Sequence, residues 1–281
     1  MTAGSPAPPV PFGRAEAAGC IDVPEAGDDK YSRGVLGVLT GSDTYPGAAV
    51  LGVEGASRTG VGMVRYVGPP RAADHVLRRR PEIVTADGRV QAWLLGSGMP
   101  PERDEALQRQ VDGILAQGLP TVLDAGALDL VGAAPGPVVL TPHFGELVPV
   151  LRAAGIETDK GRVAAEPERW AREAAAATGV TVLLKGSTTF IADASGSRWS
   201  VQAGPAWVAT AGAGDVLGGV LGALLATHAQ QLQEHPETLA DLAAAAAWIH
   251  GEAGRRASAG GPIVALDIAE ALPATIAALL A

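Results

Sequence analysis

Short apolar runs alternate with longer alanine- and leucine-rich stretches along most of the chain, and this alternation predicts its secondary structure. The short runs are rich in β-branched residues and leucine, so we expect buried strands there. The expected strands are residues 35–39, 63–67, 92–95, 121–123, 138–140, 180–184 and 190–192. The expected helices are residues 46–57, 102–117, 145–153, 167–177, 215–226, 239–256 and 268–280.

The order of these elements predicts an α/β fold. Near-continuous apolar strands separated by helices are typical of a mostly parallel sheet with helices on both faces. The composition does not change after residue 30 and no repeat is present, so we expect residues 31–281 to form one domain. Residues 1–30 are rich in proline and contain an acidic stretch at 25–29, which predicts a flexible N-terminal arm.

Composition and charge exclude several classes of function. The net charge of −9 and the 4% of aromatic residues argue against nucleic-acid binding. Cys20 is the only cysteine, so neither an intramolecular disulfide nor a cysteine-rich zinc site can form. The longest apolar stretch, residues 216–226, is too short and glycine-rich to cross a bilayer, and the first residues lack a secretory pattern. We therefore expect a cytoplasmic protein without nucleic-acid or membrane partners.

Polar and glycine-rich segments follow the expected strands, at the carboxyl ends where such sheets bind ligands. These segments are residues 40–47, 96–98, Asp124, 141–146 and 185–189. We therefore expect a ligand site at that edge, although the sequence does not predict the order of the strands.

The sharpest motif is Ala-Thr-Ala-Gly-Ala-Gly-Asp-Val-Leu at residues 209–217, a glycine-rich turn that leads into an apolar helix. The N–H groups of Gly212, Ala213 and Gly214 are expected to form an anion hole, which the helix dipole favours. Asp215 is expected at the helix start. It is interpreted either as an N-cap or as a catalytic base beside a bound phosphate, and the residues alone leave both open.

Other polar residues at the strand ends carry candidate chemistry. Lys185 ends an apolar strand, where a lysine needs an anion or solvent; a surface lysine at a turn is an equally good interpretation. His143 and Glu146 are expected on the first turn of a helix, and a plain cap accounts for Glu146 but not for His143. Asp124 is either a carboxylate of the site or a turn former. The three arginines at 78–80 are interpreted as a solvated helix end.

Taken in order, six motifs resemble those of the NAD(P)H-hydrate dehydratases, a family with a ribokinase-like fold. They are Gly-Ser-Asp-Thr-Tyr-Pro-Gly-Ala at 41–48, Gly-Ser-Gly at 96–98, Val-Leu-Asp-Ala at 122–125, Thr-Pro-His-Phe-Gly-Glu at 141–146, Leu-Lys-Gly-Ser-Thr-Thr at 184–189, and the turn at 209–217. The resemblance runs from about residue 31 to the C-terminus and implies a single ribokinase-like domain of three layers.

The resemblance implies an enzyme that dehydrates (6S)-NADHX and (6S)-NADPHX to NADH and NADPH while ADP is cleaved to AMP and phosphate. It implies that the hydrated nucleotide is bound by Ala48, Gly98, His143 and Asp215. It implies that the adenine nucleotide is bound by Lys185, Gly186, Ser187, Thr188, Thr189 and Gly214. It further implies Mg²⁺ as a cofactor and ADP or ATP as co-substrate. It also implies a homo-oligomer (a tetramer in the family) and functional pairing with a separate epimerase.

The residues suit this chemistry, because Asp215 can take the proton of the ring hydroxyl while the glycine-rich turn stabilises the transferring phosphoryl group. Two other functions stay open. A small-molecule kinase of the same fold would use Asp215 and stop at the phosphorylated product, and a non-catalytic sensor would only bind a nucleotide. The motifs at 141–146 and 185–189 favour the dehydratase over the kinase, and an intact Asp215 disfavours the sensor.

Overall fold

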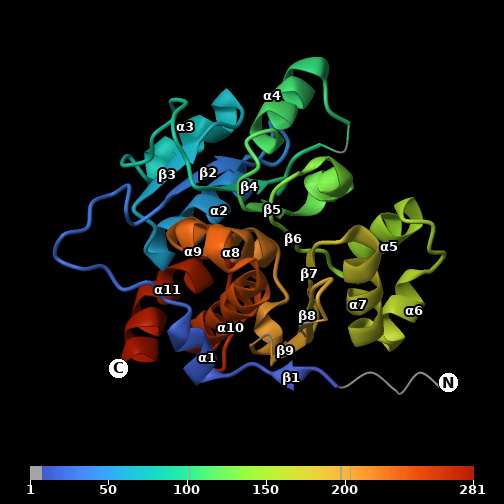
Figure 1. The fold of residues 1–281 in the computed structure, drawn as a ribbon. Coiled ribbons are helices and arrows are strands. Elements are labelled where there is room, and N and C mark those ends of the chain that lie inside the picture. The colour runs from blue at the N-terminus through green and yellow to red at the C-terminus, as the bar shows by residue number, and fades with distance from the viewer. Residues whose placement is uncertain (1–7, 101, 197, 203) are drawn as a thin grey trace.

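The computed structural model describes residues 8–100, 102–196, 198–202 and 204–281, which build one nine-stranded sheet. The strands are β1 (Val10–Pro11), β2 (Val35–Leu39), β3 (Met63–Tyr66), β4 (Ala92–Leu95), β5 (Thr121–Leu123), β6 (Val138–Leu140), β7 (Thr181–Leu184), β8 (Thr188–Ala192) and β9 (Arg198–Gln202). Their order across the sheet is β1-β9-β8-β7-β6-β5-β4-β2-β3 (Figure 1). Only β8 runs antiparallel to its neighbours, so the sheet is mostly parallel.

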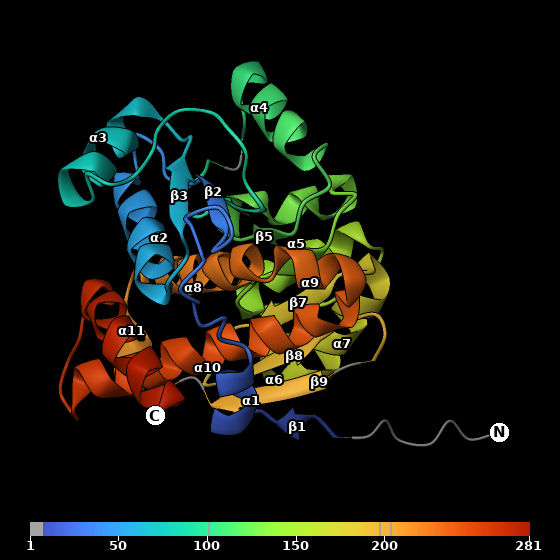
Figure 2. The same ribbon diagram turned by 60° about the vertical axis from the view of Figure 1, so that its left-hand side comes forward.

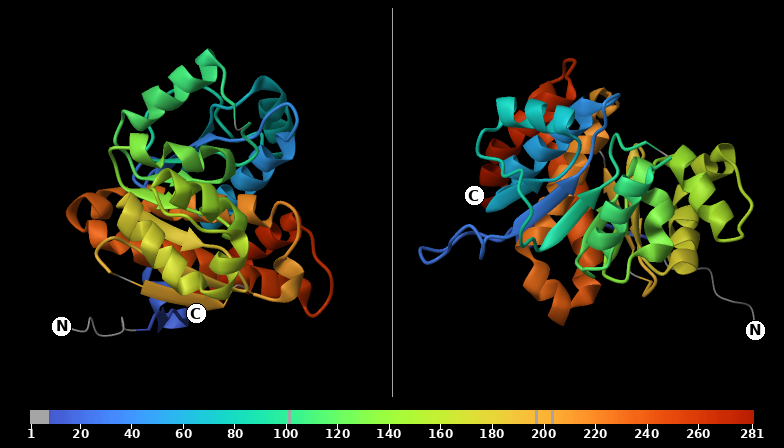
Figure 3. Two further views of the ribbon diagram at one scale, coloured as in Figure 1. Left: turned by 90° about the vertical axis from the view of Figure 1, so that its right-hand side faces the viewer. Right: turned by 90° about the horizontal axis from the view of Figure 1, so that it is seen from above.

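Helices cover both faces of this sheet (Figures 1 and 3). One layer contains α1 (Arg14–Gly19), α2 (Pro46–Thr59), α3 (Pro70–Arg79), α8 (Ala213–Thr227), α9 (Ala229–Glu234), α10 (Leu239–Ser258) and α11 (Ala265–Leu280). The other contains α4 (Glu105–Leu115), α5 (Phe144–Ala153), α6 (Lys160–Ala165), α7 (Pro167–Thr178) and the 3-10 segment η1 (Ala125–Ala133). Two further 3-10 segments are η2 (Ala206–Val208) and η3 (Pro236–Thr238). Within the described residues, no helix is long and apolar enough to span a membrane.

The alternation of side chains along each strand builds two apolar cores. In β2, Leu36 and Val38 pack under α2 and α8, whereas Val35 and Leu39 join the core on the opposite face. Helices α8 and α10 lie side by side over the first face (Figure 2). The predicted single α/β domain with a mostly parallel sheet is therefore confirmed. Each expected strand and helix is present; β2, β4, β5 and β6 have the expected bounds, and the others have shifted ends. Strands β1 and β9 and four helices (α1, α3, α6 and α9) were not predicted.

The segment expected to be a flexible arm contains ordered structure at residues 10–19. Strand β1 pairs with β9, and α1 packs against α10 and α11. Phe12 is buried and meets the ring of Trp199 edge-on, with 5.1 Å between centroids. The early prolines therefore do not keep this part free, because Phe12 and Ala17 fill the end of a core that would otherwise be exposed. Residues 1–7 lie outside the described residues.

A buried carboxylate also corrects the interpretation of residues 78–80 as a solvated helix end. Glu54 of α2 is fully buried and accepts hydrogen bonds from Arg58, Arg79 and Arg80 at 2.7–2.8 Å. Burial alone would raise the pKa of Glu54, but these three arginines lower it to about 2. A buried charge needs such partners, so Arg79 and Arg80 are tied to α2, while Arg78 and part of the Arg79 side chain are exposed as expected.

Candidate active site

A cavity of about 840 Å³ opens beside the carboxyl end of β7 and the first turn of α8. Of the residues predicted to form the site, those that line it are His143, Lys185, Gly186, Ser187, Thr189, Ala213 and Gly214. Thr188 does not line it, since neighbouring residues of β8 point to opposite faces. The cavity is large enough for a nucleotide-sized ligand.

The glycine-rich turn places Asp215 inside α8, not at its cap. Gly212 is the N-cap residue and has a φ of +87°, a left-handed conformation that glycine adopts without strain. Asp215 is therefore the third helical residue, and its interpretation as an N-cap is wrong. The N–H of Ala213 donates to the carbonyl of Thr210 at 3.3 Å, so it is not free for the expected anion hole.

Lys185 is half-buried in the candidate site, with 21% of its side chain exposed, and is not a surface lysine. Its Nζ lies 2.9 Å from Oδ1 of Asp124 and 3.8 Å from Oε2 of Glu146. Burial alone would lower the pKa of Lys185, but these carboxylates raise it, so the ammonium is charged. A Cβ atom built on Gly214 would lie 3.5 Å from Nζ, which places the ammonium against the first turn of α8.

Asp124, which sequence reasoning left ambiguous, lies at the centre of the site. It is 3% exposed, and its carboxylate accepts hydrogen bonds from Lys185 and from the hydroxyls of Ser97 and Thr141, at 2.8–2.9 Å. Burial alone would raise its pKa, but the ammonium and the hydroxyl donors lower it, so the group is ionised. The signal in the sequence was a carboxylate directly after an apolar strand.

Asp215 has the electrostatics of a proton acceptor. The side chain is half-buried, and its carboxyl makes a hydrogen bond with Ser97. Burial and the charge of Asp124 raise the pKa of Asp215 from 3.8 to about 6, against the opposing effect of Lys185. A carboxylate with a pKa near the working pH can both accept and release a proton.

Ala48 and Gly98 lie together but do not line the large cavity. Gly98 has a φ of +68°, and a Cβ atom built there would lie 2.7 Å from the Cβ of Ala48. Glycine is therefore required at this contact between the loop after β4 and the start of α2. Ser97, the residue before Gly98, joins this pair to Asp215.

His143 is the N-cap of α5, where it was expected on the first turn. Its Nδ1 accepts hydrogen bonds from the N–H groups of Gly145 and Glu146, both at 3.0 Å. Glu146 completes the capping box by accepting from the N–H of His143 at 2.8 Å. Capping thus accounts for His143, contrary to the sequence argument. Because Nδ1 is an acceptor, the proton of the neutral ring is on Nε2.

The apolar side of the cavity was missed by sequence reasoning. It is formed by Pro205, Ala206, Val208, Leu217, Ala247 and His250. Burial lowers the pKa of His250 to about 4, so the ring is neutral, and Nε2 has no hydrogen-bond partner among the described residues. The signal in the sequence for this side of the cavity was a single histidine directly after the apolar run of α10.

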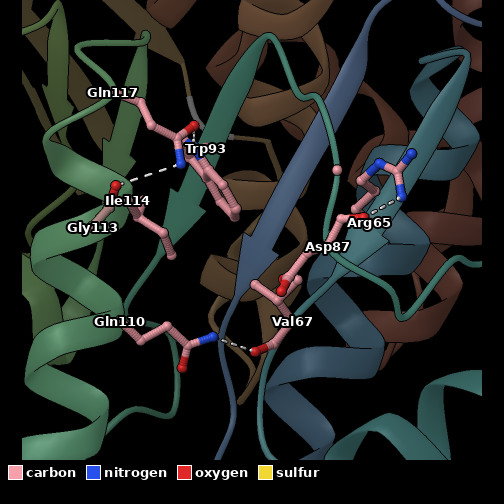
Figure 4. A pocket seen from close by; sticks show the side chains of 9 residues that line it. Arg65, Val67, Asp87, Trp93, Gln110, Gly113, Ile114 and Gln117 are labelled. Carbon is pink, nitrogen blue, oxygen red and sulfur yellow. Dashed lines mark hydrogen bonds between the residues drawn. The ribbon is translucent and has the colours of Figure 1, made fainter.

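A second, smaller cavity of about 340 Å³ lies between β3, β4 and α4 and shares no residue with the first (Figure 4). Its polar side chains mostly bond the protein itself: Gln110 donates to the carbonyl of Val67 at 2.8 Å, and Arg65 donates to the carbonyl of Ala86 at 3.0 Å. These contacts brace the loop after β3, so the chemistry is concentrated in the larger cavity.

Comparison with known proteins shows the family of the chain and its fold. A sequence profile of the NAD(P)H-hydrate dehydratases matches residues 36–274. The chain belongs to this family. A solved ADP/ATP-dependent NAD(P)H-hydrate dehydratase of Bacillus subtilis, crystallised with ATP and Mg²⁺, is similar with a TM-score of 0.83 and 26% identity, over 96% of this chain and 99% of that one. A ribokinase-like protein of Enterococcus faecalis shares the fold, with a TM-score of 0.78 and 20% identity over 96% of each chain.

The NAD(P)H-hydrate dehydratase family includes proteins of two lengths that resemble this chain. A bifunctional NAD(P)H-hydrate repair enzyme of Mycobacterium tuberculosis is 45% identical over 228 residues, 77% of this chain and 46% of that protein. The ADP-dependent (S)-NAD(P)H-hydrate dehydratase of Bacillus subtilis is 32% identical over 218 residues, 73% of this chain and 76% of that protein. The chain thus spans about half the length of the bifunctional relatives it matches.

Proposed function

We propose that this protein dehydrates (6S)-NADHX and (6S)-NADPHX to NADH and NADPH and couples each turnover to the cleavage of ADP to AMP and phosphate. The observation that carries the proposal is Asp215, with a pKa of about 6, which follows the cavity-lining Gly214 and makes a hydrogen bond with Ser97, the neighbour of Gly98. Membership of the family and the name of the ADP-dependent relative support it.

ADP binds in the 840 Å³ cavity in this proposal. The apolar wall formed by Val208, Leu217 and Ala247 suits the adenine ring. Lys185 and the hydroxyl groups of Ser187 and Thr189 suit the phosphates and ribose. The N–H of Gly214 lies on the first turn of α8, so it and the positive end of the helix dipole face the phosphoryl group. The hydrated nicotinamide lies on the side of Ala48 and Gly98.

Asp215 accepts the proton of the ring hydroxyl at C6, and the oxygen then attacks the β-phosphorus of ADP. The bond from that phosphorus to the bridging oxygen breaks, and AMP leaves. The ring nitrogen then pushes its electron pair toward C6, the C6–O bond breaks and phosphate departs. Loss of a proton from C5 restores the double bond and hence NADH. Phosphorylation is needed because hydroxide is a poor leaving group.

The local charge supports a role for Mg²⁺. Asp124, Glu146 and Asp215 surround the single ammonium of Lys185, so a diphosphate would add negative charge to a negative site. Among the described residues, no three histidine, cysteine or carboxylate side chains are grouped as a metal site. Mg²⁺ would therefore be held mainly by the phosphates of the nucleotide, and when bound it neutralises charge on the phosphoryl group.

The direct test incubates the purified protein with an epimeric mixture of NADHX, ADP and Mg²⁺. We expect NADH to form until the S epimer is consumed, while the R epimer remains. A matched variant, Asp129→Asn, changes an exposed carboxylate outside the cavity and should behave like the wild type. Accumulation of a phosphorylated hydrate without NADH would instead indicate a kinase, and equal consumption of both epimers would contradict the proposed specificity.

The proposal extends to partners and location. We propose a homo-oligomer, and a functional pairing with an epimerase that supplies the S form, in keeping with bifunctional relatives about twice as long. We also propose a cytoplasmic location, with which the single cysteine is consistent. Size-exclusion chromatography with light scattering tests the first point, and adding an epimerase to the depleted R fraction tests the second, since renewed NADH formation is expected.

A further inference from the structure

Asp124 connects the carboxyl ends of four neighbouring strands. It follows β5, and its three hydrogen-bond donors follow the adjacent strands: Ser97 after β4, Thr141 after β6 and Lys185 after β7. Polar groups on these strand ends are thereby held by one carboxylate. Both oxygens are used, Oδ2 by Ser97 and Oδ1 by the other two donors.

The backbone around Asp124 is shaped to hold it in place. Ala125, the next residue, has a φ of +44°, in the left-handed region that costs free energy for a residue with a side chain. Gly96 approaches so closely that a Cβ atom there would collide with the Asp124 carbonyl. Backbone strain of this kind is typical of a site whose geometry is needed for function. A residue that only formed a turn would not require it.

Ser97 joins Asp124 to Asp215 through a single hydroxyl. Its Oγ–H donates to Oδ2 of Asp124 at 2.8 Å, and the same oxygen bonds the carboxyl of Asp215. This hydrogen bond lowers the pKa of Asp215, because it stabilises the ionised carboxylate. The charge of Asp124 acts in the opposite direction and favours the state of Asp215 that follows proton uptake.

We propose that Asp124 is a positioning residue that holds the ammonium of Lys185 toward the nucleotide phosphates and, by its negative charge beside Asp215, stabilises Asp215 after it has accepted the substrate proton. The inference rests on the proposed function, because the proton comes from the hydrate and the phosphates from ADP. No proton passes to Asp124 itself. Three other titratable groups lie near Asp124, Lys185 and Asp215. They are Glu146 beside Lys185, His143 at the start of α5, and the neutral His250 of α10.

Two variants separate the two arms of this network. Asp124→Asn keeps the shape of the side chain but removes its charge, so both Lys185 and Asp215 are affected. We expect a KM for ADP at least tenfold higher, a lower kcat, and an acid limb of the pH profile displaced to lower pH by about one unit. Ser97→Ala leaves both charges in place and removes a hydrogen bond that lowers the pKa of Asp215, so it should move the acid limb to higher pH and leave the KM for ADP unchanged. Asp129→Asn is the control and should match the wild type in all three.

Titration of the aspartate carboxyl carbons by NMR tests the network without turnover. In the wild type, the Asp215 signal should titrate near pH 6, and in Asp124→Asn at lower pH. Calorimetry should show weaker ADP binding by Asp124→Asn and unchanged binding by Ser97→Ala. If the Asp215 titration and ADP affinity stay at wild-type values while thermal stability falls, Asp124 is only structural and the inference is wrong. A wild-type protein inactive on the hydrate would overturn the proposed function, whereas the titration and calorimetry would still decide this inference.

Discussion

The ammonium nitrogen of Lys185 lies 2.9 Å from Oδ1 of Asp124, and both side chains are withdrawn from solvent. Each group compensates the burial of the other, and the pair joins the ends of β5 and β7 at the edge of the candidate nucleotide cavity. Since Lys185 also faces the first turn of α8, one ion pair serves both the stability of the site and its charge. Substitutions can separate the two roles.

Lys185→Ala should lose stability and ADP affinity together. Asp124 would be left buried without its cation, which costs about 3–5 kcal/mol, and loss of a charge-assisted hydrogen bond lowers affinity roughly tenfold to 150-fold. Urea unfolding and calorimetric titration measure the two effects. The double variant Lys185→Ala/Asp124→Asn should recover most of the stability but not the affinity; a double variant that binds ADP like the wild type would assign Lys185 to structure alone.

Asp215→Asn should retain the fold and lose turnover. Asp215 is not the N-cap of α8, so the helix start does not depend on its carboxylate. An amide cannot accept the proton of the ring hydroxyl, and the rate should fall on the order of 10²–10⁴-fold. Steady-state kinetics with saturating ADP measure the loss, and unchanged ADP affinity by calorimetry is the control. A folded variant with a normal rate would remove Asp215 from the mechanism.

The same substitution should stabilise the protein at neutral and alkaline pH. The pKa of Asp215 rises from 3.8 to about 6 on folding, so its contribution to stability is present below 3.8 and is lost as the pH rises through 6. Asp215→Asn removes this cost, which is about 1–2 kcal/mol once partial exposure is allowed for. Thermal unfolding near pH 8 should show the gain, and the gain should vanish near pH 4. A variant less stable than the wild type near pH 8 would contradict the raised pKa.

Glu54→Gln should destabilise the packing of α2 against α3, with the opposite pH dependence. The pKa of Glu54 falls from 4.5 to about 2 on folding, so its stabilisation is present above 4.5 and is lost as the pH falls through 2. We expect a loss of about 3 kcal/mol near pH 7 in urea unfolding, shrinking toward pH 3. Glu270→Gln breaks a half-exposed pair with Arg79 and should cost less than about 1 kcal/mol. Equal effects of the two variants would argue against a special role for burial.

Phe12→Ala should show that the N-terminal segment is part of the core. Phe12 is 6% exposed and packs on Trp199, so its truncation should cost about 3 kcal/mol in denaturant unfolding. Val10, in the same segment, is 54% exposed, and Val10→Ala should change stability by less than about 0.5 kcal/mol. Two variants of equal stability would restore the picture of a free arm.

The sequence predicts the parallel part of the sheet well because periodicity reports burial. The runs that became β2 and β4–β7 are almost entirely apolar and buried at every position, because both of their faces are covered. Strand β9 is less buried and alternates less clearly, and β1 has two residues, so neither has a usable pattern. Strand β9 is held by its pairing with β8, and β1 by its long-range pairing with β9, beside which Phe12 meets Trp199.

The candidate site is predictable as a set of motifs but not as a network. Glycine at 212 and 214 and the lysine at 185 indicate an anion site from local chemistry. The link from Asp124 through Ser97 to Asp215 joins three segments far apart in the chain, and it depends on the strand order. For the same reason, the sequence did not reveal the contacts of Arg79 and Arg80, because their partner Glu54 lies on another helix.

The stoichiometry of the coupled reaction tests the central claim most directly. Wild-type protein is mixed with (6S)-NADHX, ADP and Mg²⁺, and NADH, AMP and phosphate are quantified in the same samples over time. We expect equal molar amounts of the three products, and the same assay with Asp215→Asn should yield them together at a rate lower by on the order of 10²–10⁴. NADH formed without AMP, or AMP formed without NADH, would contradict the proposed coupling.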